Sequence, residues 1–112
     1  MEIRIRRKDK VHIVDLDGRL AGTGATALHK RVEELLARGV TRLLVNLDGV
    51  DFMDSSGLGE LGWAKRAAGG HGATIKLLHI GPNVRRVLVT AGAIDTFEIF
   101  DNEPDALASF GG

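Results

Sequence analysis

The chain has 112 residues, no net formal charge at pH 7 and no cysteine, and 44% of its residues are hydrophobic against 27% charged. This length and balance predict one globular domain spanning residues 1–112 and exclude an intrinsically disordered chain. The lack of cysteine excludes disulfides, thiol catalysis and thiolate metal sites, and the balanced charge provides no general attraction to nucleic acid or an anionic membrane.

Two strands are predicted at the N-terminus, over 3–7 and 10–16, because apolar residues alternate with charged ones. A short polar turn over 8–10 joins them and predicts a β-hairpin. The segment is basic, but Asp15 and Asp17 interrupt the apolar stretch that a signal peptide needs. No run elsewhere approaches the roughly 20 apolar residues of a membrane span. We therefore expect a soluble, cytoplasmic protein without membrane insertion.

After the hairpin, helices are predicted to alternate with strands. Apolar residues at helical spacing indicate helices over 24–38, 55–68, 82–91 and 103–110, and apolar runs indicate strands over 41–47, 73–80 and 97–100. Thr23 suits the N-cap of the first helix, and Gly39 suits its end. Residues 48–54 are predicted to form a loop.

This order of elements predicts an α/β fold. We expect a mixed, largely parallel sheet with right-handed crossovers, an antiparallel N-terminal hairpin and about four helices. In such folds binding sites gather at the carboxyl ends of the parallel strands. Residues 48–59 lie at that end.

The segment F-M-D-S-S-G-L-G, residues 52–59, combines a helix start with an accessible hydroxyl. Asp54 suits the N-cap, so Ser55 would be the first helical residue, facing solvent. Free amides and the helix dipole there would favour a phosphate. Gly57 and Gly59 leave little bulk nearby, so the backbone of another protein could approach closely. Taken alone, this chemistry favours an ordinary well-capped helix start.

Two longer stretches resemble a known family. V-N-L-D-G-V-D-F-M-D-S-S-G-L-G-E-L, residues 45–61, closely resembles the core motif of the STAS family, the anti-sigma factor antagonists. G-P-N-V-R-R-V-L-V-T-A-G, residues 81–92, resembles the second signature helix of that family. The resemblance covers essentially the whole chain and implies a single STAS-like domain.

The resemblance also implies a function. A partner that is both anti-sigma factor and serine kinase would phosphorylate Ser55, the serine after the motif aspartate, and a metal-dependent serine phosphatase would reverse the reaction. Without the phosphate, the chain would bind the kinase and release its sigma factor. The protein would then be a bacterial stress-response regulator with no cofactor, and a substrate rather than an enzyme. The residues expected to bind partners are Asp54, Ser56, Gly57, Leu58, Gly59 and Trp63, with Ser56 also serving the helix cap.

Ala21 departs from the family pattern. Phosphorylatable members often carry an acidic residue at this position, in a G-x-L-D pattern where this chain reads G-R-L-A. The departure supports one alternative, a STAS scaffold without a phosphorylation switch. Such a scaffold would serve a stress-sensing assembly or be a small subunit of a lipid-transport ABC complex.

Trp63 has two interpretations. On the predicted helix it projects about 180° away from the mean direction of Leu58, Leu61 and Ala68. An exposed tryptophan there would be a docking anchor, because aromatic residues dominate interface hot spots. The alternative is packing against a neighbouring helix, and the sequence favours neither.

Patterns that suggest enzymes are incomplete. G-L-G-E-L-G, residues 57–62, matches a dinucleotide fingerprint, but the preceding strand is predicted to end well before it and the next strand ends without an acid. Neither Ser55 nor Ser56 has the glycine two residues earlier that a hydrolase requires. We expect no catalytic residue, metal site or nucleic-acid partner, because the basic segment lacks aromatic interleaving and no metal-ligand spacing links the histidines His12, His29, His71 and His79.

Overall fold

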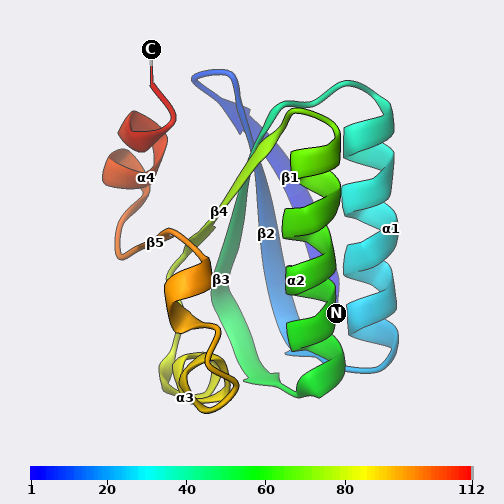
Figure 1. Ribbon diagram of the computed structural model, residues 1–112, viewed down its shortest axis with the longest axis vertical. Helices are drawn as coiled ribbons and strands as arrows, with labels where there is room; N and C mark the ends of the chain where they lie inside the picture. Colours follow the sequence, from blue (N-terminus) through cyan, green and yellow to red (C-terminus); the bar gives the residue numbers. More distant parts are fainter. Residues whose placement is uncertain (112) are drawn as a thin grey trace.

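Five strands form one mixed sheet in the order β1-β2-β3-β4-β5 in the computed structural model, which describes residues 1–111 (Figure 1). The β1–β2 pair is antiparallel and the other neighbours are parallel, which confirms the predicted fold class. The elements in chain order are β1 (Glu2–Lys8), β2 (Val11–Leu20), α1 (Thr23–Ala37), β3 (Arg42–Met53), α2 (Ser55–Gly70), β4 (Thr74–Leu78), α3 (Pro82–Thr90), the 3₁₀ turn η1 (Ile94–Thr96), β5 (Ile99–Phe100) and α4 (Glu103–Ser109).

The N-terminal hairpin closes through a tight two-residue turn. Asp9 and Lys10 both have positive φ, 52° and 67°. A turn with positive φ at both central residues matches the right-handed twist of the flanking strands. The predicted hairpin is therefore confirmed, with Lys8 paired to Val11.

β2 and β3 run further than the sequence indicated. Gly18 does not end β2, because a register shift between Gly18 and Arg19 lets the strand continue. Residues 48–53, predicted as a loop, instead complete β3 and pair with β2, with Leu20 opposite Met53. That prediction was wrong because the pairing joins segments about 30 residues apart in the chain, which local patterns do not reveal. The extension places α2 directly after the end of β3.

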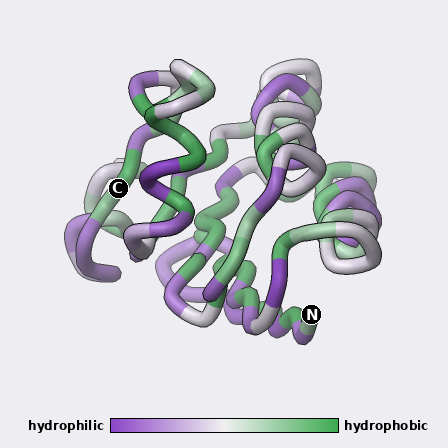
Figure 2. Tube along the Cα trace, turned by 90° about the horizontal axis from the view of Figure 1, so that it is seen from below, coloured by the Kyte–Doolittle hydropathy of each residue, from purple (hydrophilic) through white to green (hydrophobic). Residues whose placement is uncertain are grey.

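The sheet has a large hydrophobic core on one face and a smaller one on the other. The larger core joins β2, β3 and β4 to α1, α2 and α3. The smaller joins Ile13, Leu44 and Leu78 to Leu107 of α4. Figure 2 shows the hydrophobic strand positions in the middle of the molecule, between the helical layers. Across residues 1–111, no helix combines the length and apolar character needed to cross a membrane.

Lys76, on β4, fixes the end of α4 against the second face. Its side chain is buried, and its Nζ donates to the Ser109 carbonyl oxygen at 2.9 Å and to the Ser109 hydroxyl at 3.0 Å. Glu98 lies 2.9 Å from the same nitrogen, and the Phe110 ring centroid 4.7 Å. These partners compensate the cost of burying the ammonium group.

Arg6, on β1, links the sheet to the start of α4. Its Nη2 donates to Asp15 Oδ1 at 3.0 Å and to Glu103 Oε1 at 2.7 Å. Burial raises the pKa of Asp15, but the hydrogen bonds from Arg6 and Asn46 outweigh it, so the pKa lies below its ordinary value. The pKa of Glu103 is lowered, chiefly by the hydrogen bond from Arg6. Both carboxylates therefore stabilise the fold in their ionised form.

α2 approaches β2 at a point that admits only glycine. Gly57 is buried, and a Cβ built on it would overlap the Leu20 carbonyl oxygen and lie 2.8 Å from Met53 Cγ. Gly59 is exposed, and a Cβ there would meet nothing within 4 Å. The backbone that approaches Gly57 closely is therefore that of the chain itself.

Replacing Arg6 by Met is expected to lower the free energy of unfolding at pH 7 and to reduce the loss of stability as the pH falls to 3. Depressed pKa values stabilise the fold above the ordinary values of 3.8 for Asp15 and 4.5 for Glu103, and this stabilisation is lost as the pH falls through the folded-state values. Urea unfolding from pH 7 to pH 3 measures the effect. Arg4→Met removes a largely exposed ion pair with Glu2 and only the smallest contribution to the lowered pKa of Asp15, so this control should change the pH slope much less. Equal pH slopes for native and Arg6→Met chains would contradict this account.

Gly57→Ala is expected to destabilise the fold by about 1–3 kcal/mol, because the added methyl forces α2 away from β2. Gly59→Ala in the same helix is the matched control and should stabilise by about 0.5–1 kcal/mol, because alanine favours helix over glycine. Urea unfolding of both variants measures the difference. Similar stabilities for the two variants would show that the close contact at Gly57 is unimportant.

Candidate functional site

Asp54 caps the N-terminus of α2, as predicted. Its Oδ1 accepts hydrogen bonds from the Ser56 N–H at 2.9 Å, the Ser56 hydroxyl at 2.6 Å and the Gly57 N–H at 3.1 Å. The hydrogen bond from the Ser56 hydroxyl, followed by that from the Gly57 amide, lowers the pKa of Asp54. The start of the helix thus already holds a negative charge.

Ser56 joins the starts of two helices. While its hydroxyl donates to Asp54, its Oγ accepts a hydrogen bond from the Gly22 N–H at 3.2 Å. Gly22 is the N-cap of α1, one residue before the predicted Thr23, and has a φ of 53°. Ala21 precedes it and is therefore at the same junction. Asp54 is the residue that caps α2, so Ser56 does not have the expected capping role itself; its hydroxyl supports the cap by donating to Asp54, and it connects α2 to the β2–α1 loop.

Ser55 is the first residue of α2 and is exposed. Within residues 1–111, its hydroxyl has no hydrogen-bond partner. The expectation of free amides is met only in part, because the Ser56 and Gly57 amides donate to the Asp54 carboxylate and the Leu58 amide donates to the Asp54 carbonyl, which leaves the amide of Ser55 itself without a partner within the described residues. The Ser55 hydroxyl is thus accessible to a modifying enzyme without a role in holding the fold.

Ser55 and Leu58 form one side of a shallow groove of about 380 Å³ between α2 and α3. The α3 side of this groove, which we call the Ser55 groove, is formed by Arg86, Val87, Thr90 and Ala91. Its walls are largely apolar and carry one cation. Arg86 thus lines the groove that contains Ser55.

Asn83 sets the position of α3 beside this groove. Its side-chain oxygen accepts a hydrogen bond from the Met53 N–H at 2.9 Å, at the end of β3. Pro82 occupies the first helical position, so Asn83 lies in the first turn of α3 and faces the strand. Sequence reasoning missed this role. The available signal was a polar residue directly after a helix-starting proline.

Trp63 packs against the neighbouring helix, the second of the two interpretations. Its ring stacks on His29 of α1 with a centroid separation of 3.7 Å and an interplanar angle of 27°. His29 Nδ1 also lies 2.7 Å from Glu60 Oε2, one turn earlier on α2. Trp63 remains partly exposed, and its role as a docking anchor stays a prediction.

The candidate partner-binding residues therefore do not form one surface. Asp54, Ser55 and Leu58 line the Ser55 groove. Gly57 faces the interior, and Trp63 faces α1. The segment 57–62 lies inside α2 and so is not a phosphate-binding loop.

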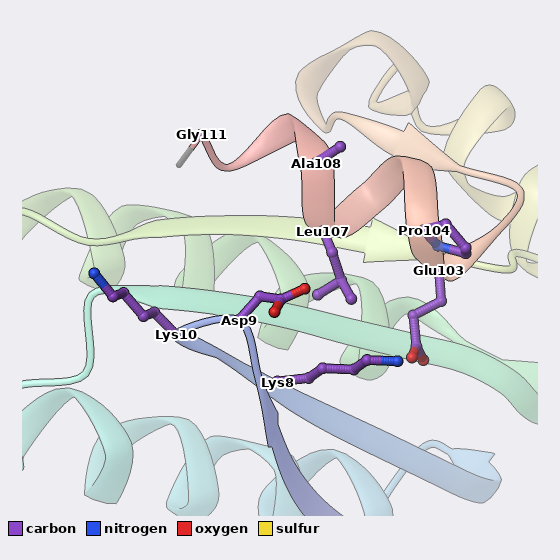
Figure 3. A pocket seen from close by; sticks show the side chains of 8 residues that line it. All are labelled: Lys8, Asp9, Lys10, Glu103, Pro104, Leu107, Ala108 and Gly111. Atoms are coloured by element: carbon purple, nitrogen blue, oxygen red, sulfur yellow. The ribbon is translucent and has the colours of Figure 1, made fainter.

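A different hollow, of about 570 Å³, lies between the hairpin turn and α4 (Figure 3). The side chains of Lys8 and Glu103 point toward one another across it, and Leu107 provides an apolar side. Both Lys8 and Asp9 lie on its hairpin side, so charges of both signs surround the hollow. It shares no lining residue with the Ser55 groove.

Comparisons with known proteins agree with this architecture. The chain is 28% identical over 108 residues to the anti-sigma F factor antagonist of Paenibacillus polymyxa, covering 96% of this chain and 92% of that protein. An anti-sigma factor antagonist from Mycobacterium paratuberculosis superposes with a TM-score of 0.86 at 25% identity, covering 96% and 92% of the two chains.

The anti-sigma factor antagonist SpoIIAA of Bacillus, solved in its unphosphorylated form, superposes with a TM-score of 0.83 at 21% identity, covering 97% of this chain and 96% of that one. A structure of its phosphorylated form superposes with a TM-score of 0.76 at 20% identity. At this identity the likeness shows the fold. The family model of the STAS domain matches residues 2–106. The chain therefore belongs to the STAS domain family.

Proposed function

We propose that this protein is an anti-sigma factor antagonist whose binding is controlled by phosphorylation of Ser55. It binds an anti-sigma factor that is also a serine kinase and thereby releases the sigma factor. Phosphorylation ends the interaction, and a metal-dependent serine phosphatase restores it. The name of the Paenibacillus relative supports the antagonist role. The observation that carries the switch is that the Ser55 hydroxyl is exposed and has no hydrogen-bond partner within residues 1–111, while the Ser56 hydroxyl beside it both donates and accepts a hydrogen bond.

The proposed switch acts through charge at the Ser55 groove. A phosphate adds about two negative charges at neutral pH. The Asp54 carboxylate already occupies the start of α2, so the phosphate is not drawn into the helix cap. Arg86 is the cation that shares the groove, and it offsets only part of the added charge. A partner that packs on Leu58 and Val87 would have to bury this charge, which is costly without a matching cation.

Incubation with ATP and the cognate kinase is expected to add one phosphate to the native chain and none to Ser55→Ala. Ser56→Ala is the matched control. It should still accept the phosphate, but it should lose about 1 kcal/mol of stability because two hydrogen bonds at the helix junction are removed. Intact mass measures the phosphate and urea unfolding measures the stability. Equal phosphorylation of Ser55→Ala and the native chain would refute the site assignment.

Affinity capture with the native chain is expected to recover an anti-sigma factor kinase, and both Ser55→Asp and the phosphorylated chain should bind it at least tenfold more weakly. Thr41→Asp adds the same charge at an exposed residue preceding β3 and should bind like the native chain. Binding constants of the captured partner measure the effect.

The scaffold alternative gives the opposite result in the same experiment. Ala21, at the junction with Ser56, is the observation that favours it, because a docking acid of the family pattern is missing there. It predicts stable capture of a transporter ATPase or a scaffold protein that Ser55→Asp leaves unchanged. Such a result would overturn the proposed switch.

A further inference from the structure

A second groove, of about 300 Å³, lies between the β-hairpin and the C-terminal half of α1. Alternation along β1 places Ile5 and Arg7 on the face toward α1, and Arg7 pairs with His12 across the ladder. Three further residues, Arg31, Glu34 and Arg38, line it from one side of α1. We call this the arginine groove. α1 begins beside Ser56 and runs away from it, so the groove lies at the opposite end of the molecule from Ser55.

The positive charges of the arginine groove are not neutralised by the fold. Within residues 1–111, the guanidinium groups of Arg7, Arg31 and Arg38 form no ion pair, in contrast to that of Arg6. Glu34 also lines the groove, but its carboxylate forms no ion pair within the described chain. Three cations and one anion leave the lining with an excess of positive charge. A cation at the C-terminus of a helix is stabilised by the helix dipole, which explains the position of Arg38 but not those of Arg7 and Arg31.

His12 provides a second, independent observation. Its Nδ1 is buried and has no hydrogen-bond partner in the part of the chain that the structure describes. Buried polar atoms are nearly always paired, so an unpaired one indicates a missing partner. Burial lowers the pKa of His12, and repulsion from Arg7 and Arg38 lowers it further. The ring is therefore neutral at pH 7, with two cations close to it.

We propose that the arginine groove binds a small anion that carries a phosphate group. Guanidinium groups present planar pairs of N–H donors that match the oxygens of a phosphate, and three of them surround one groove. His12 lines the same groove, and its neutral ring adds no positive charge there. Ile5 and Leu35 provide apolar contacts for an organic substituent. The site is separate from Ser55 and does not depend on the proposed function.

Titration of the full chain with pyrophosphate, followed by NMR of the His12 ring and the arginine side chains, tests this proposal. We expect saturable shifts at His12, and a rise in the His12 pKa on binding, because the anion offsets the repulsion from Arg7 and Arg38. Arg7→Gln combined with Arg38→Gln should weaken binding at least tenfold, and the corresponding Lys variants should bind with intermediate affinity. Arg85→Gln, at an exposed arginine on α3, is the matched control and should bind normally.

A parallel arm identifies the source of the phosphate group. The chain is mixed with vesicles of phosphatidic acid or of phosphatidylcholine and sedimented. Binding to the phosphatidic acid vesicles alone, lost when Arg7 and Arg38 are replaced, would support a lipid headgroup as the ligand. Pyrophosphate binding without vesicle binding would support a soluble phosphate compound. The proposal is overturned if neither probe binds, or if binding persists in the Gln double variant while urea unfolding shows that this variant is folded.

Discussion

The strands lie across the sheet in the same order as in the chain, so each parallel strand follows the previous one in the same direction. This constraint decides how the two faces of the sheet differ. Right-handed crossovers between strands added in one direction place their helices on one face. α1, α2 and α3 therefore share the larger core, and α4 is the one helix of the described residues that covers the other face. The second face accordingly keeps polar positions in its strands, such as Asp15 and Asn46, and Arg6 and Lys76 hold α4 there through charged hydrogen bonds.

The same constraint brings the starts of α1 and α2 together at the carboxyl ends of the strands. Gly57 allows the backbone of α2 to approach the Leu20 carbonyl at the end of β2, and Asp54 and Ser56 satisfy the polar groups of the junction. Ser55 is adjacent to all three but contributes no hydrogen bond to the junction within residues 1–111. Structural and regulatory roles can thus be separated between neighbouring serines. This separation is what a surface switch requires, because a modification must change binding without unfolding the domain.

The balanced net charge of the chain conceals a local excess at the arginine groove. There, three guanidinium groups lack ion-pair partners within the described residues, whereas the guanidinium of Arg6 is paired with Asp15 and Glu103. Composition reports the sum of the charges and not their arrangement, so it did not indicate an anion site. The arginine groove lies beside the C-terminal half of α1 and the Ser55 groove lies between α2 and α3, so a ligand at one would not directly block the other.

The sequence by itself determined the hairpin, the alternation of strands and helices, the start of α2 at Ser55 and the Asp54 cap, because each depends on residues a few positions apart. The motif at residues 45–61 also indicated the family. Only the tertiary structure decided the full lengths of β2 and β3, the inward position of Gly57, the stacking of Trp63 on His29 and the bond from Met53 to Asn83. Each of these joins residues about 30 or more positions apart, and local periodicity carries no information about which distant segment will become a neighbour.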